Sequence, residues 1–293
     1  MMQRKKFIQT MLAATGALTL GTSLRSLSEI LPEQDAVMPV LFVGHGSPMN
    51  ALEDNDFTRG WKKAVAHLPR PTAILCISAH WLTRGTFVTA MQQPRTIHDF
   101  GGFPQALFDA QYPAPGSPDV ARQVADTITS VEVGLDHDEW GLDHGTWSIL
   151  KQMYPDADIP VLQLSIDYYQ PGAWHYALAK ELSALRKKGV LIIGSGNMVH
   201  NLRMVDFSRP DTGYDWAIEM NETFKKHILE GNHAPLQDYT SLGKAASLAI
   251  PTPDHYYPLL YILGLQDKKE NVQLFNDQVL MGSLTMTSVM VGA

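Results

Sequence analysis

The stretch PVLFVGHGSP, residues 39–48, places an apolar run directly before a glycine-rich turn that contains His45. Three further runs have the same form: they are short, rich in Val, Ile and Leu, and end in or just before Gly, Ser, Asp or His, at 73–79, 160–166 and 190–194. Short apolar runs bounded by turn residues are typical of strands buried on both faces of a parallel sheet. Together with the first run, at 39–43, they predict the centre of such a sheet.

Between these runs, apolar residues recur with helical spacing at 119–128, 174–185, 216–229 and 256–263. Strands that alternate with helices predict an α/β fold, in which a mainly parallel central sheet is flanked by helices on both faces. The segment 283–291 predicts a late strand at the edge of that sheet. Because no internal repeat or low-complexity linker appears, we expect a single domain over 36–293. The Pro- and Gly-rich stretch 99–118 is expected to be a long functional loop.

The composition narrows the classes of partner. Of 293 residues, 45% are hydrophobic and 18% are charged, which is ordinary for a globular chain with a core. A formal net charge of −7 argues against nucleic acid or an anionic membrane as a partner and leaves small molecules open. Cys76 is the single cysteine, so no intrachain disulfide can form, and its apolar surroundings predict a buried thiol. No oligomeric state follows from the sequence.

The first 35 residues have the order of charged and apolar residues found in export signals. Arg4, Lys5 and Lys6 precede a mildly apolar segment at 11–24, which is too short and too interrupted to span a bilayer. This start resembles a twin-arginine export signal with Lys in the second arginine position. We therefore expect a leader over 1–35, export to the periplasm or beyond, and no stable membrane insertion. A cytoplasmic N-terminal extension is the alternative.

Several histidines lie where a ligand site is expected. His45, His80 and His200 follow the first, second and fourth predicted strands, and open α/β sheets bind ligands beyond the carboxyl ends of their strands. His255 and His144 lie in Pro- and Gly-containing stretches further along the chain. One histidine at a strand end is usually structural, but several would converge on one edge of the sheet. Neutral imidazoles are good ligands for zinc and iron, so the pattern predicts a metal site.

A histidine that binds a metal also needs a partner that orients its second ring nitrogen. Asp143, Asp254 and Asn201 each neighbour a candidate in the chain and are predicted to serve. His98 is expected in the loop that covers the site. The other histidines are predicted to have no role in the site. His67 is expected to be exposed and His137 to lie in an acidic loop, and three are expected on or after surface helices: His175, His227 and His233.

The motifs around these residues resemble a known family. In chain order they are GHGSPM at 44–49, SAHW at 78–81, IHDF with GFP within 97–104, YPAPG at 112–116, GLDHG at 141–145, GN with HN within 196–201, PTPDHY at 251–256 and MGSL at 281–284. Each motif is weak alone, but their order over the mature chain is specific. The sequence resembles the class III extradiol dioxygenases of the LigB-like superfamily, and within it the 4,5-DOPA dioxygenase extradiol branch.

This resemblance implies an enzyme that uses O₂ to open the ring of a DOPA-like catechol beside its two hydroxyls. It implies one divalent metal per chain, with Fe(II) as the working metal or zinc in its place. His45, His80 and His255 match the metal ligands. His200 matches the acid/base residue over the metal, close enough to count as a fourth ligand, and His144 matches a histidine that contacts the substrate or supports the ligands.

Three alternatives stay open. The wider superfamily favours two histidines and one carboxylate, so Asp254 is the alternative to His255 as third ligand. A zinc hydrolase could use the same histidines to activate water, although no glutamate base lies beside them in the sequence. A metal-binding protein without catalysis would have a closed site of four histidines.

Overall fold

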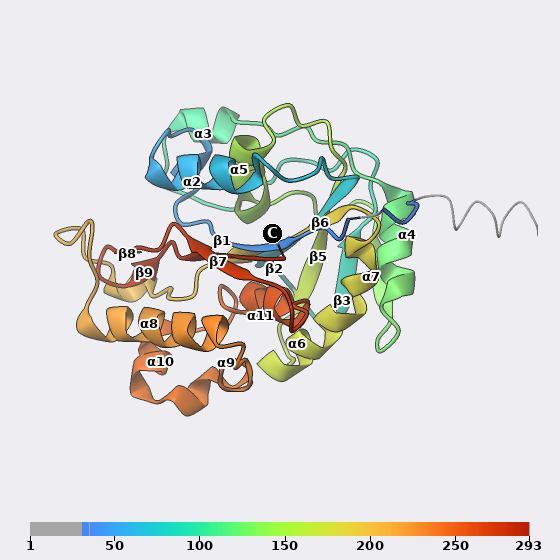
Figure 1. The fold of residues 1–293 in the computed structure, drawn as a ribbon. Coiled ribbons are helices and arrows are strands. Elements are labelled where there is room, and N and C mark those ends of the chain that lie inside the picture. The colour runs from blue at the N-terminus through green and yellow to red at the C-terminus, as the bar shows by residue number, and fades with distance from the viewer. Residues whose placement is uncertain (1–30, 35, 293) are drawn as a thin grey trace, which may run out of the picture.

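A mixed sheet of eight strands runs through the middle of the molecule, between two layers of helices (Figure 1). The structure is a computed structural model that describes residues 31–34 and 36–292. The strand order is β4-β3-β5-β2-β6-β1-β10-β7, and β8 pairs separately with β9. The strands are β1 (Val40–Gly44), β2 (Ala73–Thr83), β3 (Thr86–Thr89), β4 (Val133–Asp136), β5 (Val161–Asp167), β6 (Val190–Gly196), β7 (Val272–Phe275), β8 (Val279–Leu280), β9 (Leu284–Thr285) and β10 (Ser288–Val291).

The centre of the sheet is parallel, as the sequence predicts. β1 pairs with β6, β6 with β2 and β2 with β5, all in parallel. Every residue of β1, β5 and β6 is buried, because helices cover both faces of these strands. Antiparallel pairs lie further out, where β3 meets β5 and where β10 pairs with β1 and β7. The mainly parallel α/β fold is therefore confirmed.

Helices pack on both faces of the sheet. α2, α3 and α5 lie on one face, whereas α4 and α6 to α11 contribute to the core on the other (Figure 1). The helices are α2 (Asp56–Val65), α3 (Gln105–Asp109), α4 (Pro118–Thr127), α5 (His144–Met153), α6 (Gly172–Glu181), α7 (Ser183–Arg186), α8 (Asp215–Leu229), α9 (Ala234–Gln237), α10 (Lys244–Ala249) and α11 (Tyr257–Gly264).

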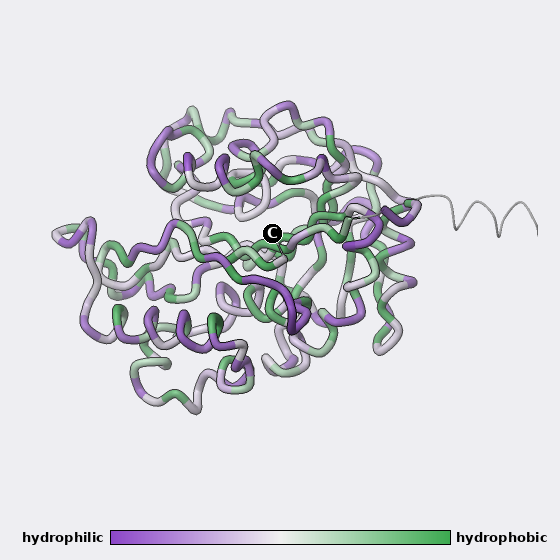
Figure 2. Tube along the Cα trace, viewed as in Figure 1, coloured by the Kyte–Doolittle hydropathy of each residue, from purple (hydrophilic) through white to green (hydrophobic). Residues whose placement is uncertain are grey.

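The sheet divides the apolar core into two layers. Side chains alternate along a strand, so Val40 and Phe42 of β1 join the core on one face and Leu41 and Val43 join it on the other. Hydrophobic positions accordingly gather along the sheet and on the inner sides of the helices, with hydrophilic positions outside (Figure 2). The burial of both faces explains why these strands are continuous apolar runs in the sequence.

Local signals in the sequence account for several of the helices. α4 begins at Pro118 because the Ser117 hydroxyl accepts a hydrogen bond from the backbone N–H of Val120, at 3.3 Å. α8 and α11 lie where the apolar spacing predicts them. The helix predicted over 174–185 is wrong in one respect, because it is divided at Leu182 into α6 and α7.

The predicted edge strand lies inside the sheet. The strand over 283–291 is shorter than predicted: β10 covers Ser288–Val291 and is hydrogen-bonded on both sides, to β1 and to β7. The edge is formed by β7, at Val272–Phe275, which the sequence analysis missed because four half-exposed residues give little periodic signal. β3 and β4 were also missed, because runs of four residues are too short to show a clear period.

The loop at 99–118 is mostly irregular, as expected, although it contains α3. It lies beside α5, a helix that the sequence analysis missed. α5 begins at His144, where the Asp143 carboxylate accepts a hydrogen bond from the N–H of Thr146 at 3.1 Å. Nearly all of α5 is buried, so it lacks the polar face that makes an amphipathic helix visible in a sequence.

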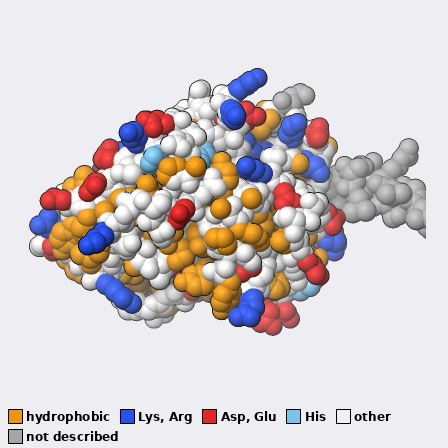
Figure 3. Space-filling model, turned by 90° about the horizontal axis from the view of Figure 1, so that it is seen from below, with side chains coloured by type: hydrophobic (Ala, Val, Ile, Leu, Met, Phe, Trp, Pro, Cys, Tyr) orange, Lys and Arg blue, Asp and Glu red, His pale blue; other side chains and the backbone are white. Residues whose placement is uncertain are grey.

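Residues 1–30 and 35, which include nearly all of the predicted leader, lie outside the part of the chain that the structure describes. Within the described part, no helix combines the length and apolar character that crossing a bilayer requires. Figure 3 shows the face seen from below, where Lys and Arg side chains are scattered among Asp and Glu around hydrophobic areas. This face therefore presents no continuous basic surface of the kind that holds nucleic acid.

Candidate metal centre

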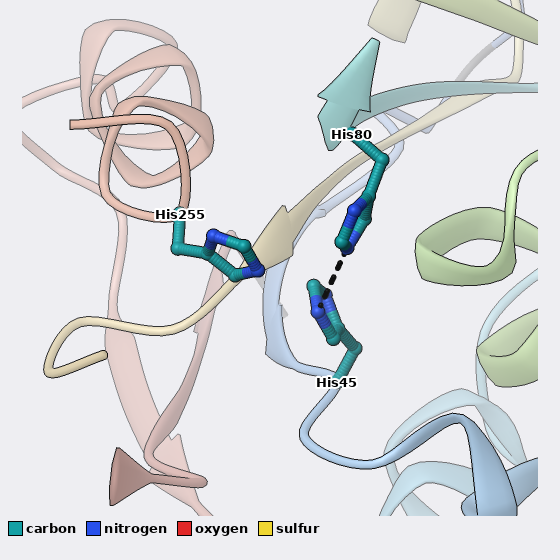
Figure 4. A group of neighbouring side chains, drawn as sticks. All are labelled: His45, His80 and His255. Carbon is teal, nitrogen blue, oxygen red and sulfur yellow. Dashed lines mark hydrogen bonds between the residues drawn. The ribbon is translucent and has the colours of Figure 1, made fainter. Parts of the chain in front are cut away.

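Three histidines from distant parts of the chain converge at the carboxyl ends of the parallel strands. His45 follows β1, His80 lies near the end of β2, and His255 lies just before α11 (Figure 4). Each offers one ring nitrogen to a group whose atoms all lie within 4.8 Å of one another. The Nε2 atoms of His45 and His80 are 3.3 Å apart. The predicted convergence of these three side chains is therefore found.

An irregularity in β2 positions His80. The strand was predicted to end before this residue, but it continues to Thr83. Ile77 pairs with Leu164 of β5, whereas Leu82 pairs with Ile166, so β2 has additional residues between the two pairs. An insertion of this kind bends the strand and redirects its side chains. It allows His80 to turn toward the other imidazoles while β2 goes on along the sheet.

His45 and His255 are oriented through their second ring nitrogens. The Nδ1 atom of His45 lies 3.0 Å from the Ser195 hydroxyl, and Nδ1 of His255 contacts the carboxylate of Asp254. These contacts leave the Nε2 atoms free to face a shared ligand. Asp254 thus lies behind His255, as the prediction of a supporting residue required. Ser195 was missed because it belongs to an apolar strand and has no polar neighbour in the sequence.

A third contact of this kind involves Asp99. Its carboxylate lies 3.4 Å from Nδ1 of His80 and 3.0 Å from Nδ1 of His144. Burial opposes ionisation of Asp99, but contact with His144 and the charge of His80 lower its pKa to about 2. Asp99 belongs to the IHDF motif, but no role was predicted for it from the sequence. Its neighbour His98 was the residue singled out there.

His200 lies against His255 rather than in the group of three. The two rings are stacked, with centroids 3.6 Å apart and planes 8° apart. His200, Asp254 and His255 form a second possible metal-binding group, in which the donor atoms again lie within 4.8 Å of one another. The backbone N–H of His200 donates to the carbonyl of Ala249 at 2.9 Å, which fixes the start of this turn. His200 is therefore beside the centre, as predicted.

Two of the predicted supporting residues act elsewhere. Asp143 is fully buried, caps α5 and bonds to Ser78 and Gln163, so it orients the local fold instead of the His144 ring. The Asn201 side chain donates to the carbonyl of Leu248 at 2.8 Å. Both predictions are therefore corrected, because neighbours in sequence point in different directions at a turn.

The other histidines lie outside the site, as predicted, but His175 and His233 are not at the surface where they were expected. His175 and His233 are buried and lie next to tyrosine hydroxyls, those of Tyr261 and Tyr176. His67 and His137 are exposed. The ring of His98 contacts the carbonyl of Ala110 at 2.8 Å, within the loop beside the site. The set that converges is limited to five histidines: His45, His80, His144, His200 and His255.

Gly196 allows the His255 segment to lie against the end of β6. A Cβ atom at this position would lie 2.1 Å from the carbonyl oxygen of His255, which accepts a hydrogen bond from the N–H of Asn197 at 2.9 Å. We expect Gly196→Ala to displace His255, to lower the free energy of unfolding by roughly 1–3 kcal/mol or more, and to reduce metal binding.

Urea unfolding and metal content measured on the same preparation test this expectation. Gly101→Ala is the matched control, because a Cβ atom there meets no other atom within 4 Å. If Gly196→Ala bound metal as well as the unchanged protein, the close approach would have no functional role.

Burial favours the neutral form of His45, His80 and His200. It lowers the pKa of His45 well below its usual value, and the charges of His80 and His255 lower it further. Burial likewise lowers the pKa of His80, and it lowers the pKa of His200 to about 3, with the charge of His255 as a smaller cause. A neutral imidazole has the lone pair that a metal requires. The electrostatics therefore suit a cation.

The metal-free protein should lose stability as the pH falls below about 6.5. Unfolded histidines take up protons near that pH, whereas His45 and His200 stay neutral in the folded protein to lower pH. The unfolded state then binds more protons and is favoured by up to roughly 2 kcal/mol per buried imidazole at about pH 5. Urea unfolding of the metal-free protein near pH 7.5 and near pH 5 checks this. The difference should shrink in His45→Gln, and equal unfolding free energies at the two pH values would contradict it.

The donor set fits a single divalent metal. Three imidazoles with converging ring nitrogens suit zinc or iron, and their Nδ1 atoms already face other groups, as in metal sites generally. Such a centre, at the carboxyl ends of parallel strands and beside further imidazoles, defines a metal-dependent enzyme of the α/β class. The chain belongs to the family described as the catalytic LigB subunit of aromatic ring-opening dioxygenase, whose model matches residues 37–291.

Individual relatives agree with this family. A 4,5-DOPA dioxygenase extradiol of Escherichia coli K12 is 51% identical over 258 residues, which cover 87% of this chain and 95% of the relative. One from Beta vulgaris is 35% identical, covering 83% and 92% of the two chains. The crystal structure of an uncharacterized Escherichia coli K12 protein superposes with a TM-score of 0.77 at 46% identity, covering 87% and 100%. The chain is thus an extradiol ring-cleavage dioxygenase, in a family whose members use a metal.

Proposed function

We propose that this chain cleaves the ring of a DOPA-like catechol at the bond beside its hydroxyls, and that both atoms of O₂ enter the product. The observation that carries the proposal is the convergence of His45, His80 and His255, whose donor atoms lie within 4.8 Å of one another. The substrate class follows from relatives that are named as 4,5-DOPA dioxygenases.

We propose His45, His80 and His255 as the residues that hold the metal, with Fe(II) as the working ion and zinc as the ion that can replace it. When bound, such a metal acts as a Lewis acid and brings the catechol and O₂ together. Three protein ligands leave positions for both, and three neutral ligands leave the full positive charge of the ion to attract a catecholate. Asp254 contacts Nδ1 of His255, which favours a supporting role over direct ligation.

His200 is proposed as the acid/base residue. Burial lowers its pKa, so the ring is neutral, and it is not one of the three proposed ligands, which leaves a ring nitrogen to exchange a proton with a catechol hydroxyl. The stack against His255 holds the ring at the edge of the centre, where a substrate hydroxyl can reach it. His144 is proposed to contact the second hydroxyl of the catechol, because the centroid of its ring lies 4.0 Å from the centroid of the His80 ring.

The hydrolase alternative is less well supported. The expected base in a zinc hydrolase of this kind is a carboxylate that is free to activate water. In the described part of the chain, the carboxylates within the histidine groups are Asp99 and Asp254, and both already contact histidine Nδ1 atoms. The family and the relatives also favour ring opening.

The test is to load the metal-free protein with Fe(II) without oxygen, add L-DOPA, and then admit O₂. We expect a yellow ring-opened product and the consumption of one O₂ per catechol. The zinc-loaded protein and the variant His45→Ala should give neither, whereas His67→Ala, at an exposed position, should match the unchanged protein. Hydrolysis of a nitrophenyl ester by the zinc form, without ring opening by the iron form, would instead support the hydrolase.

A further inference from the structure

One carboxylate lies between two of the five imidazoles. Asp99 Oδ2 is 3.4 Å from Nδ1 of His80, and Oδ1 is 3.0 Å from Nδ1 of His144. These are electrostatic contacts at ion-pair distance, because Nδ1 of His144 has no aligned hydrogen-bond partner in this structure. Oδ1 also accepts the backbone N–H of His144 at 2.9 Å. We propose that Asp99 is a positioning residue that sets the ring orientation and tautomer of both histidines, and so couples metal binding to substrate contact.

The chemistry of the groups supports a shared role. A neutral imidazole carries one N–H, and its other nitrogen is an acceptor. A carboxylate beside Nδ1 keeps the proton there, and the lone pair on Nε2 then points away from it. A carboxylate has two oxygens, so Asp99 can hold both rings at once. His80 then presents Nε2 to a metal, and His144 presents Nε2 to a substrate hydroxyl.

The surrounding geometry directs both rings into the centre. Nε2 of His80 lies 3.3 Å from Nε2 of His45, and the His144 ring lies edge-on to that of His45 with centroids 5.6 Å apart. His144 is 6% exposed. Its ring is therefore confined between Asp99 on one side and the converging imidazoles on the other.

The loop that carries Asp99 is itself held in place. Phe100 packs edge-on against His144 with ring centroids 5.6 Å apart, and it also contacts Phe108 and Trp147. Trp147 in turn donates its ring N–H to the carbonyl of Ile97 at 2.8 Å. These contacts fix the carboxylate relative to α5, so its position does not depend on the side chain alone.

Asp99 differs from the other supporting groups in the number of rings that it serves. Asp254 contacts His255, and Ser195 contacts His45, so each affects one candidate ligand. Loss of Asp99 should affect two functions together. The inference rests on the proposed function for the role of His144, but the part that concerns His80 can be tested without catalysis.

The first experiment measures tautomers in the metal-free protein, labelled with ¹⁵N at histidine. Long-range ¹H–¹⁵N spectra should show that His80 and His144 both carry their proton on Nδ1. In Asp99→Ala both should lose this preference, and in Asp99→Asn, which has one accepting oxygen, at most one should keep it. A proton on Nε2 of either ring in the unchanged protein would overturn the proposal, and this measurement needs no variant to fold.

The second experiment measures zinc affinity by competition with a chelator. Asp99→Ala should bind zinc about 10–100-fold more weakly, because His80 loses its support. His144→Ala should bind zinc as the unchanged protein does, and so should the control Asp109→Asn, an exposed carboxylate on α3. Unchanged zinc affinity in Asp99→Ala would remove His80 from the proposal.

The third experiment compares turnover of L-DOPA at saturating Fe(II). Asp99→Ala and His144→Ala should each lower kcat, and the double variant should be no slower than the slower single variant, because both changes remove one coupled unit. Multiplied losses would show that Asp99 does not act through His144. If no form cleaves catechol, the proposed function fails, while the tautomers and the zinc affinity still decide the role of Asp99.

Discussion

His200→Ala is expected to keep most of its metal while ring cleavage falls by about 10²–10⁴-fold, the usual contribution of a positioned proton-transfer group. The metal is retained because His45, His80 and His255 form a complete group without it. Turnover falls because the variant lacks the His200 imidazole, which stacks on His255 and is proposed to take the catechol proton. Metal content by mass spectrometry and initial rates with L-DOPA should be measured on the same Fe(II)-loaded sample.

The comparison variant is His137→Ala, which removes an exposed histidine and should change neither quantity. A His200→Ala protein that loses metal and activity together would show that His200 acts mainly as a ligand. That outcome is most relevant with zinc, because zinc often takes four protein ligands in a closed site. Full activity would remove His200 from the mechanism.

His255→Ala is expected to lose the metal, whereas Asp254→Ala should retain it with about 10–100-fold weaker affinity. The reason is the orientation of the His255 ring between Asp254 and the other histidines. Nδ1 of His255 faces the Asp254 carboxylate, and the opposite side of the ring faces His45 and His80, with ring centroids 5.2 and 5.0 Å away. The change at His255 removes a donor atom, while the change at Asp254 removes its support.

Chelator competition with zinc and with Fe(II) compares the two variants directly, and circular dichroism checks that both are folded. If Asp254→Ala lost the metal and His255→Ala kept it, the third ligand would be the carboxylate. The site would then have the two-histidine, one-carboxylate set of the wider superfamily. This pair of variants therefore decides which neighbour in the PTPDHY motif binds the ion.

The elements with a regular pattern of apolar residues could be predicted from the sequence. The four central strands are continuous apolar runs because both of their faces are buried, and α4, α8 and α11 follow helical spacing, with a side-chain cap at α4. The place of an element could not be predicted where it depends on contacts with residues far away in the sequence. β10 could not be placed inside the sheet, since pairing on both sides is decided by β1 and β7, which lie far from it in sequence.

For the site, the sequence by itself determined which residue types were available and at which edge of the sheet they would gather. His45 and His200 follow strands, and the carboxyl ends of parallel strands meet at one edge, so their proximity follows from topology. The local pattern around PTPDHY also put Asp254 beside His255, and the structure keeps them in contact.

The orientation of each imidazole ring was decided by the tertiary structure alone. The irregularity in β2 that turns His80 inward appears only when β2 is paired with β5. Asp99 meets His80 and His144 from a loop, and Ser195 meets His45 from another strand. These contacts join residues 19 to 150 positions apart, so they are fixed by the packing of the whole sheet and its helices. The sequence supplies the candidate ligand side chains, but only the folded chain brings their ring nitrogens to one point.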